Sequence, residues 1–186
     1  MTLDTLEAIR TRRVAKYYDQ ARAVPEDMLW TVLEAARWAP TGGNLRVHRF
    51  VCVTEKDLIR KIQLFFPGMV AGLPAALIFV CIKWDLAGYK CLIKSYNEVY
   101  YDIGGYAQNM LLAAHALGLA AGPMTSFSRA ALRVLLNLPD EIDPRLCVGV
   151  GFPADPPAHM PRWPKVKLKV QDLVQWGPYP VTAKSD

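Results

Sequence analysis

The feature that most constrains the fold is an almost uninterrupted apolar run from Ala75 to Trp84, with the sequence AALIFVCIKW. A run without polar alternation is typical of a strand that is covered on both faces. Such a strand needs a packing layer on each side, and apolar stripes of helical period before and after it predict that helices form those layers. The pattern therefore predicts an α/β or α+β protein, and a length of 186 residues favours one domain.

Hydrophobic periodicity and turn residues indicate the other elements. Pro25 suits the first turn of a helix, and Pro40 ends it. The stretch 119–127 is rich in small residues and fits either a tightly packed buried strand or a space for a planar ligand. We expect helices at about 3–12, 25–39, 56–66, 98–118 and 128–136, and further strands at about 49–54 and 146–152.

The last part of the chain, residues 153–186, differs from the rest because it is rich in proline and has little helical period. Trp163, Trp176 and Tyr179 are costly to leave in water, so we expect this tail to dock, on a partner subunit. We accordingly expect residues 1–186 to form a single domain with 153–186 as its tail.

The net charge of +5 and the pI of about 9.1 indicate an anionic partner, which could be a nucleic acid, an acidic lipid or a phosphorylated cofactor. A nucleic acid is disfavoured because no recognition motif is present. No apolar stretch reaches the ~20 residues that a membrane helix needs. The start, MTLDTLEAIR, lacks the basic end of a signal peptide. We therefore expect a soluble, cytoplasmic protein that binds neither nucleic acid nor membrane.

The cysteines and histidines suggest no metal site. Cys52, Cys81 and Cys147 lie in apolar runs, where a thiol is usually part of the core, and no C-x-x-C pair is present. His48 and His115 have no metal-ligand spacing. The sequence therefore predicts core thiols in a reducing compartment.

Four patches could carry chemistry, although each also has a purely structural explanation. Residues 10–16 (RTRRVAK) hold four cations, which suit an anion or a solvated helix end. Residues 39–44 (APTGGN) allow close backbone approach to a phosphate or a flat ligand, or simply stop a helix. Residues 118–127 offer small side chains and two hydroxyls. In residues 162–169 (RWPKVKLK), lysines alternate with apolar residues, which suits a strand with one basic face or simply a solvated edge strand.

The order of these patches resembles the nitroreductase family of FMN flavoproteins. RRVAK resembles the family's Arg-Arg-Ser-x-Arg/Lys element, and LEAARWAPTGGN at 33–44 its helix and loop. QNMLLAAHALGL at 108–119 is similar to its central helix, GVGFP at 149–153 to its Gly-x-Pro strand end, and RWP at 162–164 to its closing Arg-x-Pro. The likeness covers about residues 3–175. It implies an α+β fold, a three-layer α/β/α arrangement with a mixed sheet, and an intertwined homodimer with the FMN sites at its interface.

The resemblance also implies roles for individual residues. Arg12, Arg13 and Lys16, with the Val14 backbone, would hold the FMN phosphate and ribityl chain, and Arg162 would be the C-terminal phosphate-binding arginine. Thr41, Gly42 and Asn44 would line the flavin from the neighbouring subunit. The backbone of Pro123, Met124, Thr125 and Ser126 would approach the flavin ring, with an N–H near N5, and no side chain would act as a dedicated catalyst.

The implied function is that of an FMN-dependent oxidoreductase that takes hydride from NAD(P)H and reduces a nitroaromatic, quinone or related small molecule. An alternative is a dehydrogenase or oxidase on a biosynthetic substrate, because Phe66-Pro67-Gly68 and Pro123-x-x-Ser126-Phe127 look closer to the cyclodipeptide oxidase branch. A non-enzymatic flavin-binding protein is a third possibility. This chain departs from the family pattern at Val14, where Ser is usual, and at Arg46-Val47-His48, where the family has Gln-Pro-Trp at the rim of the substrate cavity.

Overall fold

A computed structural model describes residues 4–15, 17–69, 72–86, 97–156 and 168–178 of the chain. Four strands form one sheet in the order β1-β2-β4-β3, and each neighbouring pair is antiparallel. The strands are β1 (His48–Val53), β2 (Ala76–Lys83), β3 (Ala120–Met124) and β4 (Ile142–Gly151). The helices are α1 (Thr5–Thr11), α2 (Glu26–Arg37), α3 (Lys56–Gln63), α5 (Asn97–Ala116) and α6 (Arg129–Leu135), with short 3-10 turns η1 (Gly42–Asn44) and η2 (Val170–Asp172).

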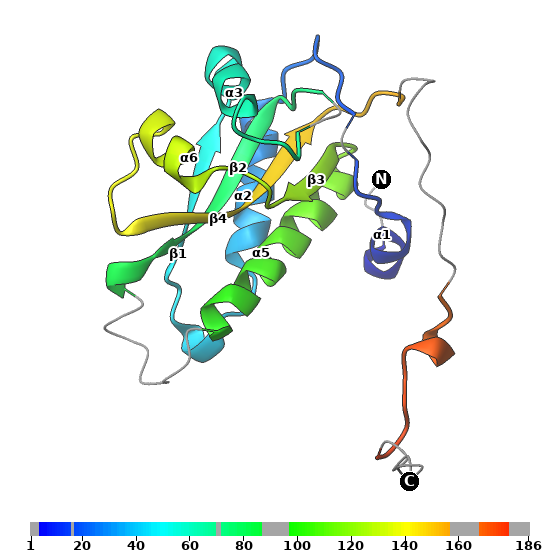
Figure 1. Cartoon of the computed structure of the whole chain (residues 1–186). Coiled ribbons are helices and arrows are strands. Elements are labelled where there is room, and N and C mark those ends of the chain that lie inside the picture. Colours follow the sequence, from blue (N-terminus) through cyan, green and yellow to red (C-terminus); the bar gives the residue numbers. More distant parts are fainter. Residues whose placement is uncertain (1–3, 16, 70–71, 87–96, 157–167, 179–186) are drawn as a thin grey trace, which may run out of the picture. The chain divides into compact units, whose positions relative to one another are not determined.

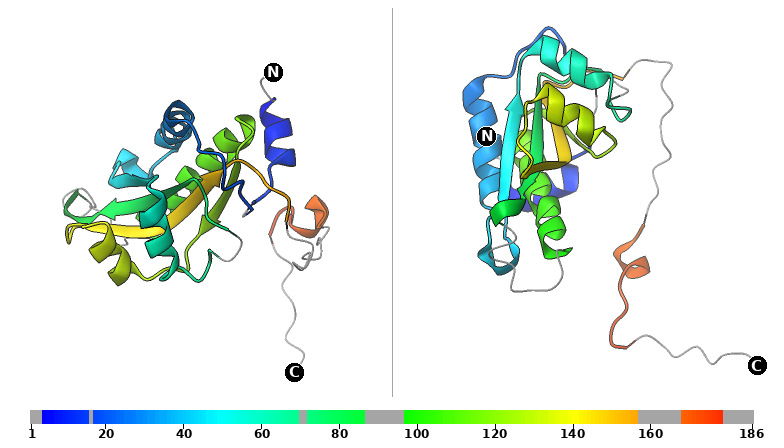
Figure 2. Two further views of the ribbon diagram at one scale, coloured as in Figure 1. Left: turned by 90° about the horizontal axis from the view of Figure 1, so that it is seen from above. Right: turned by 60° about the vertical axis from the view of Figure 1, so that its left-hand side comes forward.

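Helices cover both faces of the sheet, as the apolar run predicts (Figure 1). Every residue of β2 except Lys83 is buried. Ile78 and Val80 pack in the cluster that contains α2 and α5, whereas Leu77 and Phe79 pack in the cluster that contains α3 and α6. This alternation follows from the two-residue period of a strand. Figure 2 shows the same arrangement from two further directions. The α+β class and the three layers are confirmed.

The sheet differs from the expectation in two details. No parallel pair occurs among the described strands, so the mixed pairing that we expected is not found in this part of the chain. β4 begins at Ile142 rather than near 146 and runs through Pro144. The proline is tolerated because β3 pairs only with Cys147–Gly151, and because the ladder with β2 shifts its register between Val80 and Cys81. Residues 120–124 form a mostly buried strand, which was one of the two structures expected for this stretch of small residues.

The segment between α1 and α2 is tied to the sheet through Tyr18. Its hydroxyl lies 3.1 Å from the carbonyl oxygen of Ala15 and 3.2 Å from that of Gly149. A Cβ on Gly151 would lie 2.8 Å from Cδ1 of Tyr18, so the buried ring occupies the space that this glycine leaves. The backbone of Tyr18 also bridges Pro153. The N-terminal segment is therefore fastened to the end of β4.

The cysteine prediction is correct for two of three residues. Cys81 and Cys147 are buried, but Cys52 is exposed because it lies on β1, which forms an edge of the sheet. Cys91 lies outside the described residues, as do the predicted site residues Lys16 and Arg162 and the tail aromatics Trp163 and Tyr179.

The described residues belong to two units, one reaching Pro156 and one following it. In the second unit, the Asp172 carboxylate accepts a hydrogen bond from the backbone N–H of Lys169 at 2.9 Å. The apolar side chains of Leu173 and Trp176 are exposed. The division into a domain and a tail stays a prediction. Within the described ranges, no helix combines the length and the apolar character needed to cross a membrane.

Candidate functional site

The first predicted patch lies where α1 ends. The Asp4 side chain caps the start of this helix by accepting from the N–H groups of Leu6 and Glu7. Arg12 is the C-cap residue, and its Nε and Nη1 are buried without a hydrogen-bond partner in the described part of the chain. Arg13 donates from Nη1 to the carbonyl oxygens of Arg10 and Arg12, at 2.7 and 2.9 Å. Arg12 therefore has unsatisfied donors, and the neighbouring Arg13 is already held in place by the backbone.

This patch is joined to β3 and to the end of α5. The N–H of Ala15 donates to the carbonyl oxygen of Ala121 at 3.0 Å, so the chain just beyond Val14 runs against β3. The Thr11 hydroxyl lies 2.8 Å from Nε2 of His115, near the C-terminal end of α5. The Val14 side chain is half exposed. Residues 12–14 are therefore held beside the strand that leads into the patch at 123–126.

That patch begins in β3 and ends in an exposed turn. Met124 is buried, whereas Thr125 and Ser126 are exposed. The Thr125 carbonyl accepts from the N–H of Phe127 at 3.1 Å, and within the described residues the N–H of Ser126 has no hydrogen-bond partner. A Cβ on Gly68 would collide with Oγ of Ser126, so the turn at 66–68 packs directly on this segment. The backbone at 125–126 is therefore accessible and carries a free donor.

The third patch, Thr41–Asn44, lies at the other end of α5. The N–H of Gly42 donates to Oδ1 of Asp102 at 2.9 Å. Gly43 and Asn44 both have positive φ, 56° and 53°, and Oδ1 of Asn44 accepts from Nε of Arg46 at 2.9 Å. This left-handed conformation is uncommon for residues other than glycine, although asparagine adopts it more readily than most. The residues predicted to line the flavin thus sit on a bent, fixed loop.

One chain does not bring all the predicted residues together. Asp102 anchors the loop at 41–44, and His115 anchors α1, so the two patches are attached to α5 thirteen residues apart. At 1.5 Å per residue, this separation is about 20 Å along the helix. Figure 1 shows α1 beside the end of α5 that precedes β3, away from the beginning of that helix. The structure thus ties the chain next to residues 12–14 to the strand that leads to 123–126, and it anchors the loop at 41–44 at the other end of α5.

A buried polar cluster that the sequence did not reveal lies under the loop. His48 is buried, and its Nε2 lies 2.8 Å from the carbonyl oxygen of Val99, to which it donates. Its Nδ1 is buried without a partner in the described residues, and burial lowers the pKa of the imidazole. The ring of Tyr106 lies 4.9 Å away, and burial raises the pKa of its hydroxyl. No local pattern predicted this cluster, because His48 and its partner Val99 are 51 positions apart in the chain.

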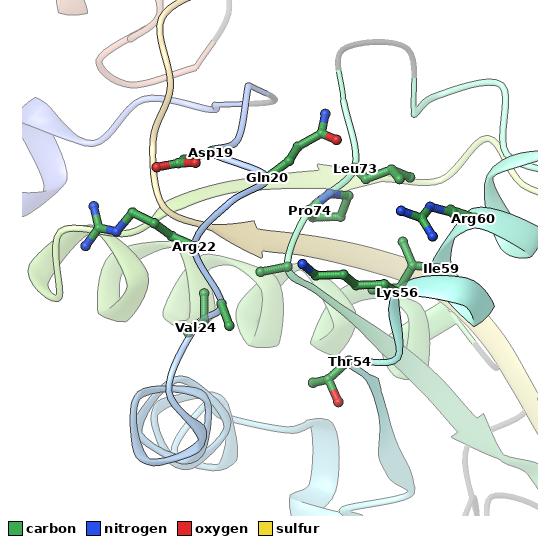
Figure 3. A pocket seen from close by; sticks show the side chains of 12 residues that line it. Asp19, Gln20, Arg22, Val24, Thr54, Lys56, Ile59, Arg60, Leu73 and Pro74 are labelled. Atoms are coloured by element: carbon green, nitrogen blue, oxygen red, sulfur yellow. The ribbon is translucent and has the colours of Figure 1, made fainter.

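Two hollows lie elsewhere on the chain. A cavity of about 120 Å³ lies between the segment before α2, the start of α3 and the approach to β2; Figure 3 shows Arg22, Lys56 and Arg60 among the side chains around it. A larger groove of about 700 Å³ runs between α2 and the edge strand β1, with Trp30 and Phe50 among its lining. None of the residues predicted to hold a cofactor lines either hollow. No cluster of metal-ligating side chains occurs in the described ranges.

Comparison with known proteins identifies relatives over most of the chain. The model of the nitroreductase family matches residues 9–152. A protein of Methanothermobacter thermautotrophicus, named as an NADH dehydrogenase/NAD(P)H nitroreductase, is 34% identical over 161 residues, which are 83% of this chain and 80% of that protein.

Solved structures give the same picture. A nitroreductase family protein from Clostridium difficile is 25% identical, covers 94% of this chain and 98% of its own, and superposes with a TM-score of 0.73. A nitroreductase from Desulfovibrio desulfuricans, solved in complex with FMN, is 24% identical, covers 97% and 100%, and has a TM-score of 0.77. This last likeness shows the shared fold.

Proposed function

Because the chain belongs to the nitroreductase family, we propose that it is an FMN-dependent oxidoreductase that takes hydride from NAD(P)H and reduces a nitroaromatic, quinone or similar small molecule. The observation that carries the cofactor assignment is Arg12, whose buried Nε and Nη1 have no partner in the described residues. A buried, unpaired guanidinium is costly, and a phosphate dianion would satisfy it. The FMN bound to the relative from Desulfovibrio desulfuricans supports the same assignment.

The residues at the end of α1 fit a phosphate and its sugar-like chain. Arg12 would bind the phosphate through its planar fork, and Arg13 would offer the donors that its bonds to Arg10 and Arg12 leave free. Lys16 and Arg162 would add charge to the same pocket, and both lie outside the described residues. The basic excess of the chain would then serve a phosphate site assembled from both of its ends.

Bound FMN would supply the hydride chemistry, and the protein would supply orientation and hydrogen bonds. The backbone of Pro123–Ser126 would support the ring, and the free N–H of Ser126 would donate to its N5 edge. The Ser126 side chain, packed over Gly68, would keep that N–H in place. No side chain here is assigned to acid–base catalysis.

The two ends of α5 support a homodimer with the flavin at its interface. The two patches are anchored to α5 about 20 Å apart, and from this we infer that Thr41, Gly42 and Asn44 would line the flavin of a second copy. Leu6 and Ile9 on α1 are 65% and 48% exposed, so α1 presents an apolar face that a partner would cover. We further propose that the C-terminal tail embraces that partner and that the protein works in the cytoplasm, where its free Cys52, Cys81 and Cys147 would stay reduced.

An anaerobic absorbance spectrum of the purified protein, before and after addition of NADH and then NADPH, tests the proposal. We expect a flavin spectrum that bleaches. Replacing both Arg12 and Arg13 by Ala should lower FMN affinity by at least about a hundredfold, because each charge-assisted contact contributes ~1.5–3 kcal/mol. Arg10→Ala is the control, because Arg10 pairs on the surface with Glu7 and its replacement removes one neighbouring positive charge to which the proposal assigns no role. A double variant that purifies with full FMN would refute the phosphate assignment.

A second candidate is a dehydrogenase or oxidase that acts on a biosynthetic substrate with the same cofactor. One contact favours it: the two segments that resemble the cyclodipeptide oxidase branch, 66–68 and 123–127, pack together, with the rings of Phe66 and Phe127 5.1 Å apart. A flavin that stays oxidised with NADH and NADPH but bleaches with an organic substrate would establish this alternative.

A further inference from the structure

Two arginines, Arg46 and Arg49, lie where the loop after η1 leads into β1. Arg46 and Arg49 are both exposed. Nε of Arg46 donates to Oδ1 of Asn44 at 2.9 Å, and Nη1 of Arg49 donates back to the carbonyl oxygens of Arg46 and His48, at 3.1 and 2.7 Å. These bonds fold both side chains onto the loop. They attach both cations to the same loop.

Neither guanidinium has a carboxylate partner among the described residues. Other arginines of this chain pair with an acidic residue three positions earlier, as Arg37 does with Glu34 and Arg60 with Asp57. Asp102, which acts electrostatically on His48 and Tyr106, accepts a hydrogen bond from the N–H of Gly42 and forms no ion pair with Arg46 or Arg49. The pair therefore carries positive charge that nothing in the described structure neutralises.

The backbone conformation of Arg46 adds to this argument. Its φ is 51°, a left-handed conformation that a side chain other than Gly or Asn rarely adopts. The loop thus keeps a long cationic side chain in a strained place and fixes it through Asn44 and Arg49. Strain that is maintained in this way is typical of a position that contacts a ligand.

We propose that Arg46 and Arg49 form a cationic rim that selects substrates carrying a carboxylate or phosphate. This inference rests on the proposed function, in which the loop at 41–44 faces the flavin of the other subunit. Arginine forks bind such oxyanions with two parallel hydrogen bonds. The anion could belong to the electron acceptor, as an aromatic carboxylate, or to the donor, as the extra phosphate that distinguishes NADPH from NADH.

Steady-state kinetics of the flavin-loaded enzyme can test the rim with matched substrates. The acceptors are 4-nitrobenzoate and the neutral 4-nitrobenzyl alcohol, and the donors are NADPH and NADH. In the variant with both Arg46→Gln and Arg49→Gln, we expect the kcat/KM ratio of nitrobenzoate to nitrobenzyl alcohol, or that of NADPH to NADH, to fall by about fivefold to thirtyfold, mainly through KM. The wild-type ratio should also fall as salt rises from about 0.02 M to about 0.3 M, because screening weakens exposed ion pairs.

The two arms identify the source of the anion. A fall confined to the nitrobenzoate ratio assigns the rim to the acceptor, and a fall confined to the NADPH ratio assigns it to the donor. Arg60→Gln, which removes an exposed charge beside the cavity of Figure 3, is the control and should change either ratio by less than about twofold.

A binding measurement completes the test without turnover. Calorimetric titration of the flavin-loaded enzyme with benzoate and with benzyl alcohol should show an affinity for benzoate that falls by about tenfold in Arg46→Glu, because the reversed charge repels the carboxylate. A flavin-loaded double variant with both ratios and the benzoate affinity unchanged would overturn the rim alone. A wild-type protein that takes up no FMN would overturn the rim and the proposed function together.

Discussion

At the scale of single residues, the buried ring of Tyr18 has its place because residue 151 is a glycine and has no side chain. The ring fills the space above the glycine, and its hydroxyl is bonded to backbone carbonyls on both sides. Gly151→Ala would place a methyl group 2.8 Å from Cδ1 of Tyr18. We expect it to lower the free energy of unfolding by about 2 kcal/mol, because the buried ring has little room to move. Urea unfolding followed by circular dichroism measures the loss.

A double-mutant cycle separates this collision from other effects of the alanine. In a Tyr18→Ala background the ring is gone, but Cβ of residue 18 and the backbone N of Ala75 stay 3.2 and 3.3 Å from the new methyl group, so adding Gly151→Ala should cost about 1 kcal/mol less than it does in the wild type. Two losses that simply add would show that the ring is not what Gly151 accommodates.

His48 gives the protein a predicted sensitivity to acid. Burial lowers its pKa below the 6.5 of an ordinary histidine, so the unfolded chain takes up the proton first as the pH falls. The stability that neutral His48 contributes is therefore complete above about pH 6.5 and declines as the pH falls below that value. We expect His48→Phe, which keeps a ring against Tyr106, to flatten the dependence of the unfolding free energy on pH between about 7 and 5.

The His48 interpretation is wrong if wild type and His48→Phe lose the same stability on acidification. Nothing in the sequence around His48 predicted its burial, because its neighbours Arg46 and Arg49 are charged and the groups that cover it come from α5.

At the scale of elements, the loop at 41–46 depends on one distant carboxylate. Asp102 on α5 accepts from the N–H of Gly42, and the residues that follow adopt positive φ. In Asp102→Ala this N–H loses a charged acceptor, which should lower the free energy of unfolding by about 1.5 kcal/mol. Amide hydrogen exchange at Gly42 should become faster, and this is the more specific measurement.

Asp57→Ala is the control, since Asp57 pairs with Arg60 on the surface and should contribute less than about 0.5 kcal/mol. Unchanged exchange at Gly42 in Asp102→Ala would show that the loop holds its conformation without this bond.

The elements themselves were largely predictable, because long apolar periods report burial directly. β2 and α5 follow their patterns closely. β4 was harder because Pro144 reads as a strand boundary. The strand continues through it because β3 pairs only with Cys147–Gly151 and because the ladder with β2 shifts its register there. Cys52 was misjudged for a related reason: an apolar run does not say whether its strand lies in the middle or at the edge of the sheet.

At the scale of the whole molecule, the proposed dimer predicts that some exposed residues matter for stability. Trp176 in the tail is 88% exposed and Val134 on α6 is 83% exposed. If the tail embraces a partner, Trp176→Ala should weaken dimerisation by at least about tenfold, since a buried tryptophan commonly dominates an interface. Val134→Ala should leave the dimer unchanged. Sedimentation equilibrium across a range of concentrations measures both.

An equal monomer–dimer equilibrium in the two variants would mean that the tail does not dock through Trp176.

The motifs of the candidate site and their order could be predicted from the sequence. Their positions in space could not, because the motifs fall at both ends of α5. In the proposed dimer a second chain would join them, and no local pattern encodes the distance between them.

The length of α5 has a genetic consequence. If each flavin is held by Arg12 of one chain and by the loop of the other, a chain defective at Arg12 and a chain defective at Asp102 damage different halves of each site. A mixed dimer of the two would contain one site with both lesions and one with none. Two inactive alleles expressed together should therefore complement each other, whereas either allele alone should not.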